Sequence, residues 1–292
     1  MPDLAMTEAS KWRFALAEKI AASCIQNPKT QVVMVAGSVG RGCADAFSDL
    51  EIDVYYSEPP TETDRIEAVE RCGGTLKGLA EDAYEWEEQM EFNGFSAATS
   101  TFLIETMENF ITEVVDRCEI ASDGQTRLYS LINAIPIIGT DWVEKWRAKA
   151  EPYPEGLVVN MLRKYLPFHE FGYDEDMLVA RNDLLRLYEK FVKIEQQMIG
   201  ALLGLNRISM PSPDHTKRMD EIIASMHFKP ENLAERLKEA FHIEPQLGVR
   251  ELRTVISEIL ALVEQHLPEF DVTPYRDPLI KKRISWDYSP LG

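Results

Sequence analysis

Three glycines stand within one short segment, directly after a run of apolar and β-branched residues. The run covers residues 31–36 and predicts a short buried strand, because it is rich in valine and ends at a glycine. Gly37, Gly40 and Gly42 can each adopt a positive φ and let the main chain approach a ligand closely. The sequence therefore predicts a strand that ends in a tight loop able to hold a ligand against the backbone.

The loop at residues 37–42 carries the groups that bind an anion. Consecutive N–H groups of a glycine-rich turn form a concave anion site. The hydroxyl of Ser38 adds a hydrogen-bond donor, and the guanidinium of Arg41 can hold phosphate oxygens as a bidentate fork. We therefore expect Gly37, Ser38, Gly40 and Arg41 to bind the phosphates of a nucleotide.

Acidic residues alternate with apolar residues shortly after this loop. In a strand, the spacing of Asp49, Glu51 and Asp53 places all three carboxylates on one face. Asp49 and Glu51 would lie roughly 6–7 Å apart at their Cα atoms, close enough for two carboxylates to hold Mg²⁺. Asp53 would lie roughly 13 Å from Asp49 and is too distant to share that ion. The alternative is a glycine turn followed by an edge strand with a solvated acidic face.

Together, Gly37-Ser38 and Asp49-x-Glu51 resemble the signature of the DNA polymerase β-like nucleotidyltransferase superfamily. Within it, the chain most resembles the small bacterial antibiotic nucleotidyltransferases of the lincosamide, aminoglycoside and kanamycin type. The resemblance implies an α+β protein with an N-terminal mixed-sheet catalytic domain and a C-terminal α-helical bundle. It also implies Mg²⁺-dependent transfer of a nucleotidyl group, which we expect to be AMP from ATP, onto a hydroxyl of a small molecule such as an aminoglycoside. Gly37 and Ser38 match the family's phosphate loop, and Asp49 and Glu51 match its catalytic, metal-binding acids.

The family's pattern includes a third carboxylate on a later strand, and the matching run in this chain has no acid. That run covers residues 94–104, and Ala97 or Ala98 stands where the carboxylate is expected. Glu91 before the run and Glu105 after it are the remaining candidates. Two other functions therefore stay open. One is a nucleotide-binding or interaction module of the same fold without turnover, and the other is an enzyme that transfers AMP onto a protein.

The formal net charge of −18 constrains the substrate. A nucleic-acid substrate is disfavoured, because phosphate backbones are bound through Lys and Arg side chains. A cationic small molecule is compatible with the charge. Acids near Trp86 predict an acidic lip that would attract a polyamine, with an ordinary solvated face as the alternative. These acids are Asp82, Glu85, Glu87, Glu88 and Glu91.

A length of 292 residues accommodates two domains. Proline and tyrosine at residues 151–154 mark the boundary between a nucleotidyltransferase domain, residues 1–150, and a helical domain with a C-terminal tail, residues 151–292. No apolar run is long enough to span a membrane, and no signal peptide is visible at the N-terminus. The scattered cysteines, without Cys-x-x-Cys spacing, are typical of reduced thiols. We therefore expect a cytoplasmic protein whose oligomeric state the sequence does not indicate.

Helical periodicity dominates the second half and predicts helices over residues 157–166, 176–205, 217–227, 232–240 and 249–267. In the first half, helices are predicted over residues 7–26, with Thr7 as the N-cap, and over 106–118, while residues 135–139 suggest a hydrophobic turn. The Leu205-Asn206-Arg207 segment followed by Lys217 resembles a pattern of related helical domains, which implies that Lys217 contacts the triphosphate. The alternative is a helix C-cap at Asn206 with surface bases around it.

Overall fold

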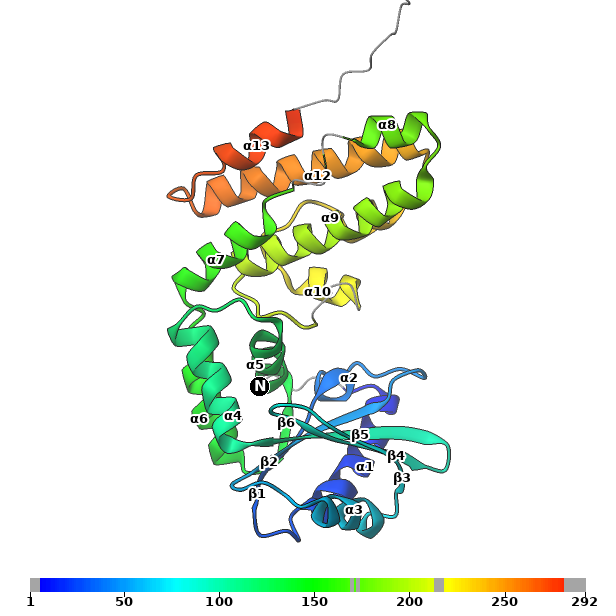
Figure 1. Cartoon of the computed structure of the whole chain (residues 1–292), viewed down its shortest axis with the longest axis vertical. Coiled ribbons are helices and arrows are strands. Elements are labelled where there is room, and N and C mark those ends of the chain that lie inside the picture. Colours follow the sequence, from blue (N-terminus) through cyan, green and yellow to red (C-terminus); the bar gives the residue numbers. More distant parts are fainter. Residues whose placement is uncertain (1–5, 169–170, 172–173, 213–217, 281–292) are drawn as a thin grey trace, which may run out of the picture. The chain divides into compact units, whose positions relative to one another are not determined.

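The computed structural model describes residues 6–168, 171, 174–212 and 218–280, and the chain divides into two compact units (Figure 1). The first unit, Met1–Pro152, contains all the strands of the described residues, and the described part of the second, Tyr153–Gly292, is helical. The fold class is therefore α+β, as predicted. The predicted boundary after residue 150 lies two residues before the division between the units, and the independent folding of two domains stays a prediction.

The first unit is built on one six-stranded mixed sheet. Its strands are β1 (Thr30–Val35), β2 (Leu50–Tyr56), β3 (Thr75–Glu81), β4 (Trp86–Phe92), β5 (Phe95–Leu103) and β6 (Ile135–Ile138). The order across the sheet is β3-β4-β5-β2-β1-β6. β2 and β5 are parallel, and the other neighbouring strands are antiparallel. The parallel pair places the start of β2 beside the start of β5.

Residues 135–139 do not form the predicted hydrophobic turn. Ile135–Ile138 is strand β6, which pairs with β1 at the edge of the sheet, and Pro136 lies opposite Met34. A proline is tolerated there because an edge strand has one side without ladder hydrogen bonds. Gly139, with φ 73°, then turns the chain into the next helix.

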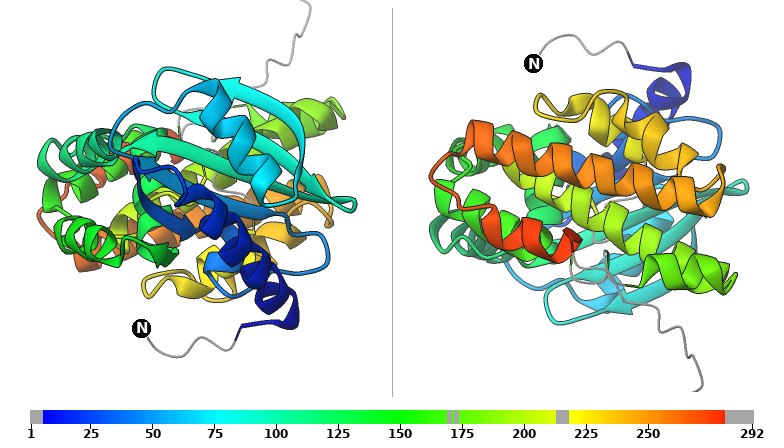
Figure 2. Two further views of the ribbon diagram at one scale, coloured as in Figure 1. Left: turned by 90° about the horizontal axis from the view of Figure 1, so that it is seen from below. Right: turned by 90° about the horizontal axis from the view of Figure 1, so that it is seen from above.

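Among the described residues of the first unit, six helices flank the sheet, namely α1 (Glu8–Cys24), α2 (Gly37–Gly40), α3 (Glu62–Arg71), α4 (Ile104–Ile111), α5 (Ser122–Asn133) and α6 (Thr140–Ala150). A π-helical turn, Thr112–Asp116, continues α4. The Thr7 hydroxyl accepts from Ser10 N and caps α1, as predicted. Thr61 and Asp64 form a capping box at α3. Helices α1 and α3 cover one face of the sheet (Figure 2).

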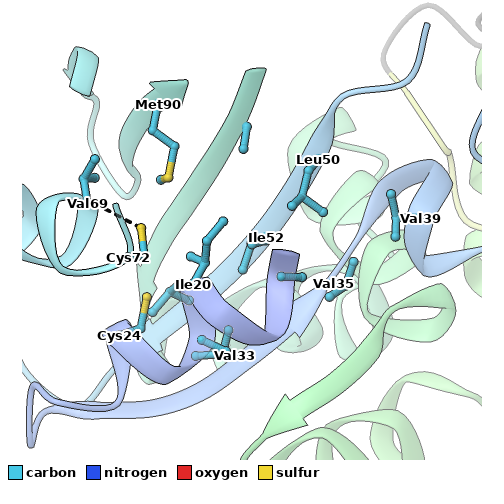
Figure 3. Close-up of a cluster of buried hydrophobic side chains, with 14 of the residues drawn as sticks. Ile20, Cys24, Val33, Val35, Val39, Leu50, Ile52, Val69, Cys72 and Met90 are labelled. Carbon is cyan, nitrogen blue, oxygen red and sulfur yellow. Dashed lines mark hydrogen bonds between the residues drawn. The ribbon is translucent and has the colours of Figure 1, made fainter. Parts of the chain in front are cut away.

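The face that α1 and α3 cover is the apolar core of the first unit (Figure 3). Valine and isoleucine side chains of β1 and β2 meet helix side chains there and are almost fully buried. The cluster includes Ile20, Cys24, Val33, Val35, Leu50, Ile52, Val69, Cys72 and Met90. Because side chains alternate along a strand, the residues between Leu50, Ile52 and Val54 point to the opposite face.

The opposite face of β2 therefore carries Glu51, Asp53 and Tyr55. Tyr55 stacks on Phe102 of β5, with ring centroids 5.4 Å apart, and contacts Trp146 of α6 at 5.0 Å. Aromatic packing closes this face toward one end of β2, and the acids lie toward the other end, where the loop after β1 is found.

The second unit contains the helices α7 (Glu155–Tyr165), α8 (Glu175–Ala180), α9 (Leu184–Leu205), α10 (Met219–Ser225), α11 (Leu233–Glu239), α12 (Pro245–His266) and α13 (Thr273–Ile280). The predicted single helix over residues 176–205 is broken between α8 and α9, where Asn182 has φ 55°. Helix α9 approaches α7 closely, because a Cβ on Gly200 or Gly204 would lie 2.5 Å from side-chain atoms of α7. Among the described helices, none combines the length and the apolar character needed to cross a bilayer.

Candidate functional site

The loop after β1 begins with a single helical turn, α2. Gly37 has φ 60° and Gly42 has φ 73°, so both use the positive φ that the sequence predicts. Gly40 is required for a different reason, because a Cβ there would lie 2.5 Å from the carbonyl oxygen of Val35. Gly40 does not use a positive φ, and this glycine instead permits close packing of α2 on β1.

Main-chain hydrogen bonds fix the conformation of the loop. Gly40 N donates to Ala36 O at 2.9 Å, and Cys43 N donates to Ser38 O at 2.9 Å. The first amide groups of α2 have no acceptor inside their own helix. Among the described residues, the half-buried Ser38 hydroxyl makes no hydrogen bond. These donors are the groups that an anion at the loop would engage.

The N-terminal half of α1 holds the segment between the loop and β2. Thr7 N donates to Gly42 O at 3.1 Å, and Ala44 N donates to Ser10 Oγ at 3.0 Å. The buried guanidinium of Arg13 donates to Ser48 O from Nε at 2.9 Å and from Nη2 at 2.7 Å. These contacts fix the backbone immediately before Asp49. Helix α1 is thus a positioning element for the first predicted acid.

The two predicted metal-binding acids lie at the start of β2. Asp49 is exposed and directly precedes the strand, and Glu51 is half-buried within it. The Glu51 side chain lies directly against the loop, because a Cβ built on Gly37 would be 2.0 Å from Glu51 Oε2. Leu50 between the two acids is fully buried on the core face. The structure therefore brings Gly37 and Glu51 into contact. Asp49 precedes Glu51 by two positions along the chain.

No carboxylate occupies the third position on β5. Ala98 is the residue in register with Glu51. Glu91 lies on β4, two strands from β2, and pairs with Lys77 at 3.2 Å. Glu105 lies on α4, after the end of β5. Neither substitutes for the missing acid, and the described residues contain no group of three His, Cys, Asp or Glu side chains that could hold a metal.

Two accessible carboxylates nevertheless fit Mg²⁺ when it arrives with a nucleotide. In nucleotide sites this ion is usually held through one or two carboxylates, with substrate phosphates and water completing its octahedron. Asp49 and Glu51 supply that number of carboxylates beside a loop suited to phosphate. The donor set therefore fits a metal carried by a triphosphate better than a metal held by protein alone.

Asp53 belongs to a buried ion pair that the sequence did not indicate. Its carboxylate is 2% exposed, accepts from Ser130 Oγ at 2.9 Å, and lies 3.3 Å from Arg127 Nη1. Arg127 also reaches Glu85 at 3.3 Å and lies over the ring of Phe102, 4.4 Å from its centroid. Asp53 is therefore a structural neighbour of the acid pair, as predicted.

The electrostatics of this pair follow from its burial. Burial raises the pKa of Asp53, and the charge of Arg127 and the hydrogen bond from Ser130 oppose that rise. Burial also acts to lower the pKa of Arg127, but the charges of Asp53 and Glu85 outweigh it, so that pKa is raised. Arg127 therefore stays a cation beside the site. Arg127 and Ser130 lie on α5, more than seventy residues after Asp53, and no local pattern marks them.

Of the two basic residues predicted to bind phosphate, Arg41 is among the described residues and Lys217 is not. Arg41 is half-buried, its guanidinium carbon lies 5.9 Å from the ring centroid of Tyr129, and it forms no ion pair with any described residue. Lys217 lies outside the described residues. Asn206 caps the C-terminus of α9 and bonds Leu202 O and Phe228 O through Nδ2, each at 2.8 Å. Asn206 is therefore a C-cap, and the contact of Lys217 with a triphosphate stays a prediction.

Three of the five acids in the predicted lip around Trp86 are paired with cations from other elements. Glu88 is buried on the core face, where it pairs with Arg65 and accepts from Thr99 and Thr101. Asp82 Oδ1 accepts from two main-chain amides of its own turn. Glu85 pairs with Arg127 and Glu91 with Lys77, so the negative charge of these acids is partly compensated.

One exposed aromatic residue near the site escaped the sequence prediction. Phe47 is 97% exposed and stands two residues before Asp49, at the tip of a turn that Asp45 caps by accepting from Phe47 N at 2.9 Å. A ring in this position offers a stacking surface close to the acids. The sequence feature that could have revealed it is a large apolar residue, Phe47, inside a turn of small and polar residues.

Comparison with known proteins gives distant structural likeness. No protein-family model and no curated protein matches the sequence. The chain is similar to the MgGTP-bound Cid1 poly(U) polymerase, with a TM-score of 0.28 and 15% identity over 44% of this chain and 43% of that chain. A cytoplasmic RNA terminal U-transferase has a TM-score of 0.28 and 15% identity over 44% of this chain and 41% of that one. A nucleotidyltransferase-like protein from Exiguobacterium sibiricum has a TM-score of 0.34 and 11% identity over 87% of this chain and 78% of its own.

The chain therefore spans less than half the length of the first two proteins. At these TM-scores the likeness supports no functional conclusion, and the loop and acids of this chain carry the evidence for its function.

Proposed function

We propose that the first unit binds a Mg²⁺–nucleoside triphosphate at residues 37–42 and transfers its nucleotidyl group onto an acceptor hydroxyl. The observation that supports this is the contact between the Glu51 carboxylate and the positive-φ Gly37. It sets a carboxylate beside a turn of amide donors, and that arrangement suits a phosphate group with its cation. An edge strand with a solvated acidic face would not need the carboxylate to pack against the loop.

Each residue has a role that follows from its position. The first-turn amides of α2 and the Ser38 hydroxyl donate to phosphate oxygens, and Arg41 adds a cation that no described carboxylate neutralises. Asp49 and Glu51 would hold Mg²⁺, which when bound offsets negative charge on the phosphates during in-line displacement. The acceptor hydroxyl oxygen bonds to the α-phosphorus as the bond from that phosphorus to the bridging oxygen of the β-phosphate breaks. Pyrophosphate leaves, and the hydroxyl proton passes to solvent. Because these donors are already fixed by the fold, they can stabilise the charge that develops on the phosphate oxygens without a cost for reorganising the protein.

The finer identity of the substrates also belongs to this proposal. ATP is the nucleotide that we expect, with AMP as the transferred group. The net charge of −18 favours a cationic small-molecule acceptor over a nucleic acid, and an aminoglycoside-like antibiotic has that chemistry. Phe47 provides a ring on which either the base or the acceptor can stack.

Pyrophosphate release with a panel of hydroxyl acceptors tests the proposal, measured with and without Mg²⁺ and beside fluorescent-ATP binding. Glu51→Gln is expected to lower the Mg²⁺-dependent rate at least tenfold, about 1.4 kcal/mol of transition-state stabilisation. The matched control is Glu70→Gln, an exposed residue of α3 on the far face of the sheet, which should leave the rate unchanged. Undiminished Mg²⁺-dependent binding and release in Glu51→Gln and in Asp49→Asn would overturn the metal-site assignment.

A second candidate is a nucleotide-binding module without turnover, and Ala98 is the observation that favours it. Such a module would bind ATP with Mg²⁺ and release no pyrophosphate with any acceptor. Transfer of labelled AMP onto a protein would instead indicate a protein-modifying enzyme. The same assay, run with α-labelled ATP, separates the three outcomes.

A further inference from the structure

A groove lies at the C-terminal end of β5. At this end the strand runs directly into α4 (Figure 1). Its volume is about 320 Å³, within the usual range for small-molecule sites. Residues before and at the start of β4 form one wall, and residues of α4 and the π-helical turn form the other. All lining residues belong to the first unit.

Aromatic rings form much of the groove. Tyr84, Trp86 and Phe110 line it, and the rings of Tyr84 and Phe110 meet edge to face, with centroids 5.4 Å apart at 87°. The Tyr84 hydroxyl donates to Asp123 at 2.6 Å, which fixes the orientation of that ring. The groove is therefore walled by π-systems, at least one of which is held in place by its own hydrogen bond.

The charged groups of the groove are all acidic. Glu105 and Glu113 line it, and no lysine or arginine does so among the described residues. Within the described part of the chain, neither carboxylate has an ion-pair partner, whereas Glu108 on the same helix pairs with Lys145 at 3.4 Å. The side chain of Asn109 adds a neutral polar group. The lining thus combines aromatic faces with uncompensated negative charge.

We propose that this groove binds an organic ammonium ion. Aromatic faces attract a cation placed over them, and the two carboxylates supply the opposite charge. A neutral ligand would leave the carboxylates uncompensated, and an anion would be repelled by them. The chemistry selects an amine or quaternary ammonium compound with an apolar body.

The groove is distinct from the proposed nucleotide site. Ala98, beside Glu51, and Leu103, in the groove, are separated by roughly 16 Å along β5. A ligand in the groove therefore does not take part in chemistry at Glu51, and the proposal stands independently of nucleotidyl transfer.

Nuclear magnetic resonance titration tests the groove with choline as the cation and 3,3-dimethylbutan-1-ol as its neutral isostere. Choline is expected to shift the Trp86 indole N–H signal saturably, and the isostere to bind at least threefold more weakly. Equal affinity for the two probes, or no saturable shift with choline, would overturn the proposal.

Variants locate the binding site. Trp86→Leu should abolish the saturable binding, and the paired change Glu105→Gln with Glu113→Gln should weaken it at least threefold. Glu108→Gln is the matched control, since Glu108 lies on the same helix outside the groove and should bind choline as the unmodified chain does. If Trp86→Leu does not fold, the glutamate variants decide the question, and equal affinity in the paired variant and in Glu108→Gln contradicts the proposal.

Discussion

The Glu51 carboxylate occupies the position that a side chain at Gly37 would need. Gly37 follows the end of β1 and Glu51 is in β2, and these strands are direct neighbours in the sheet. The loop and the acid strand are therefore complementary in shape, and Gly37 cannot be enlarged without moving the Glu51 side chain.

Gly37→Ala is expected to weaken Mg²⁺–ATP binding at least tenfold. The added Cβ would collide with Glu51 Oε2, and the positive φ adds a backbone cost of about 1 kcal/mol. Gly94→Ala is the matched control, because Gly94 has φ 87° and nothing lies within 4 Å of its Cβ position. Fluorescent-ATP titration compares them, and similar affinities for the two variants would contradict the role of the Gly37–Glu51 contact.

Ala98→Asp is expected to strengthen metal-dependent binding of ATP. Ala98 is in register with Glu51 on the adjacent parallel strand, so an aspartate there places a third carboxylate about 5 Å away across the sheet. Mg²⁺ titration in the presence of ATP should give a midpoint at least threefold lower. Ala98→Asn has the same shape without the charge, and an equal gain in that variant would exclude a metal effect.

Arg127→Met is expected to destabilise the first unit by about 3 kcal/mol. The change leaves the Asp53 carboxylate, 2% exposed, without its ion-pair partner, and a single buried charge is costly. Adding Asp53→Asn should restore part of the loss. Arg71→Met removes an exposed pair with Glu67 and should change the unfolding free energy by about 0.5 kcal/mol or less. Urea unfolding measures all three, and equal losses in the two arginine variants would refute the proposed burial cost.

Stability should fall as the pH rises because of Glu195 on α9. Burial raises the pKa of Glu195 from its ordinary value of 4.5 to about 8, and its Oε1 atom has no hydrogen-bond partner among the described residues. Between pH 4.5 and about 8 the folded state then binds more protons than the unfolded state, so the unfolding free energy decreases as pH increases through that window.

Glu195→Gln should remove that slope, with a difference of up to a few kcal/mol, roughly 1.4 kcal/mol for each pKa unit. Urea unfolding at pH 5, pH 6.5 and pH 8 gives the slope. Glu189→Gln serves as the control, because Glu189 is exposed and its pKa is lowered by hydrogen bonds from Lys193 and Arg186. If Glu195→Gln keeps the slope of the unmodified chain, another group causes it.

Local patterns predicted the elements that hold the candidate site. The valine run and the acid alternation act over a few residues, and β1 and β2 follow them. The glycine segment, predicted as a loop, begins with the helical turn α2. Thr7 was also predictable, since an N-cap depends on its own helix. Such patterns can be read without knowing any distant contact, because the spacing of residues along a strand sets the face of the sheet to which each side chain points.

Features that depend on distant parts of the chain were not predictable. Pro136 suggested a turn, yet β6 can accept it because the sheet has an edge there. Arg127 neutralises Asp53 across a separation of seventy-four residues, and nothing local to either residue signals that pair. The acids near Trp86 likewise gave an expectation of open negative charge, whereas partners on other elements neutralise most of them.

The alternation along β2 also restricts how chain length can vary in evolution. One inserted residue inside the strand would turn Glu51 and Asp53 into the apolar core and send Leu50 and Ile52 out of it. Insertions in the exposed turn at residues 45–47 would instead cost little, because the closure entropy of a loop grows slowly with its length. Relatives of this chain should therefore differ in length before Asp49 and remain free of gaps from there to the end of β2.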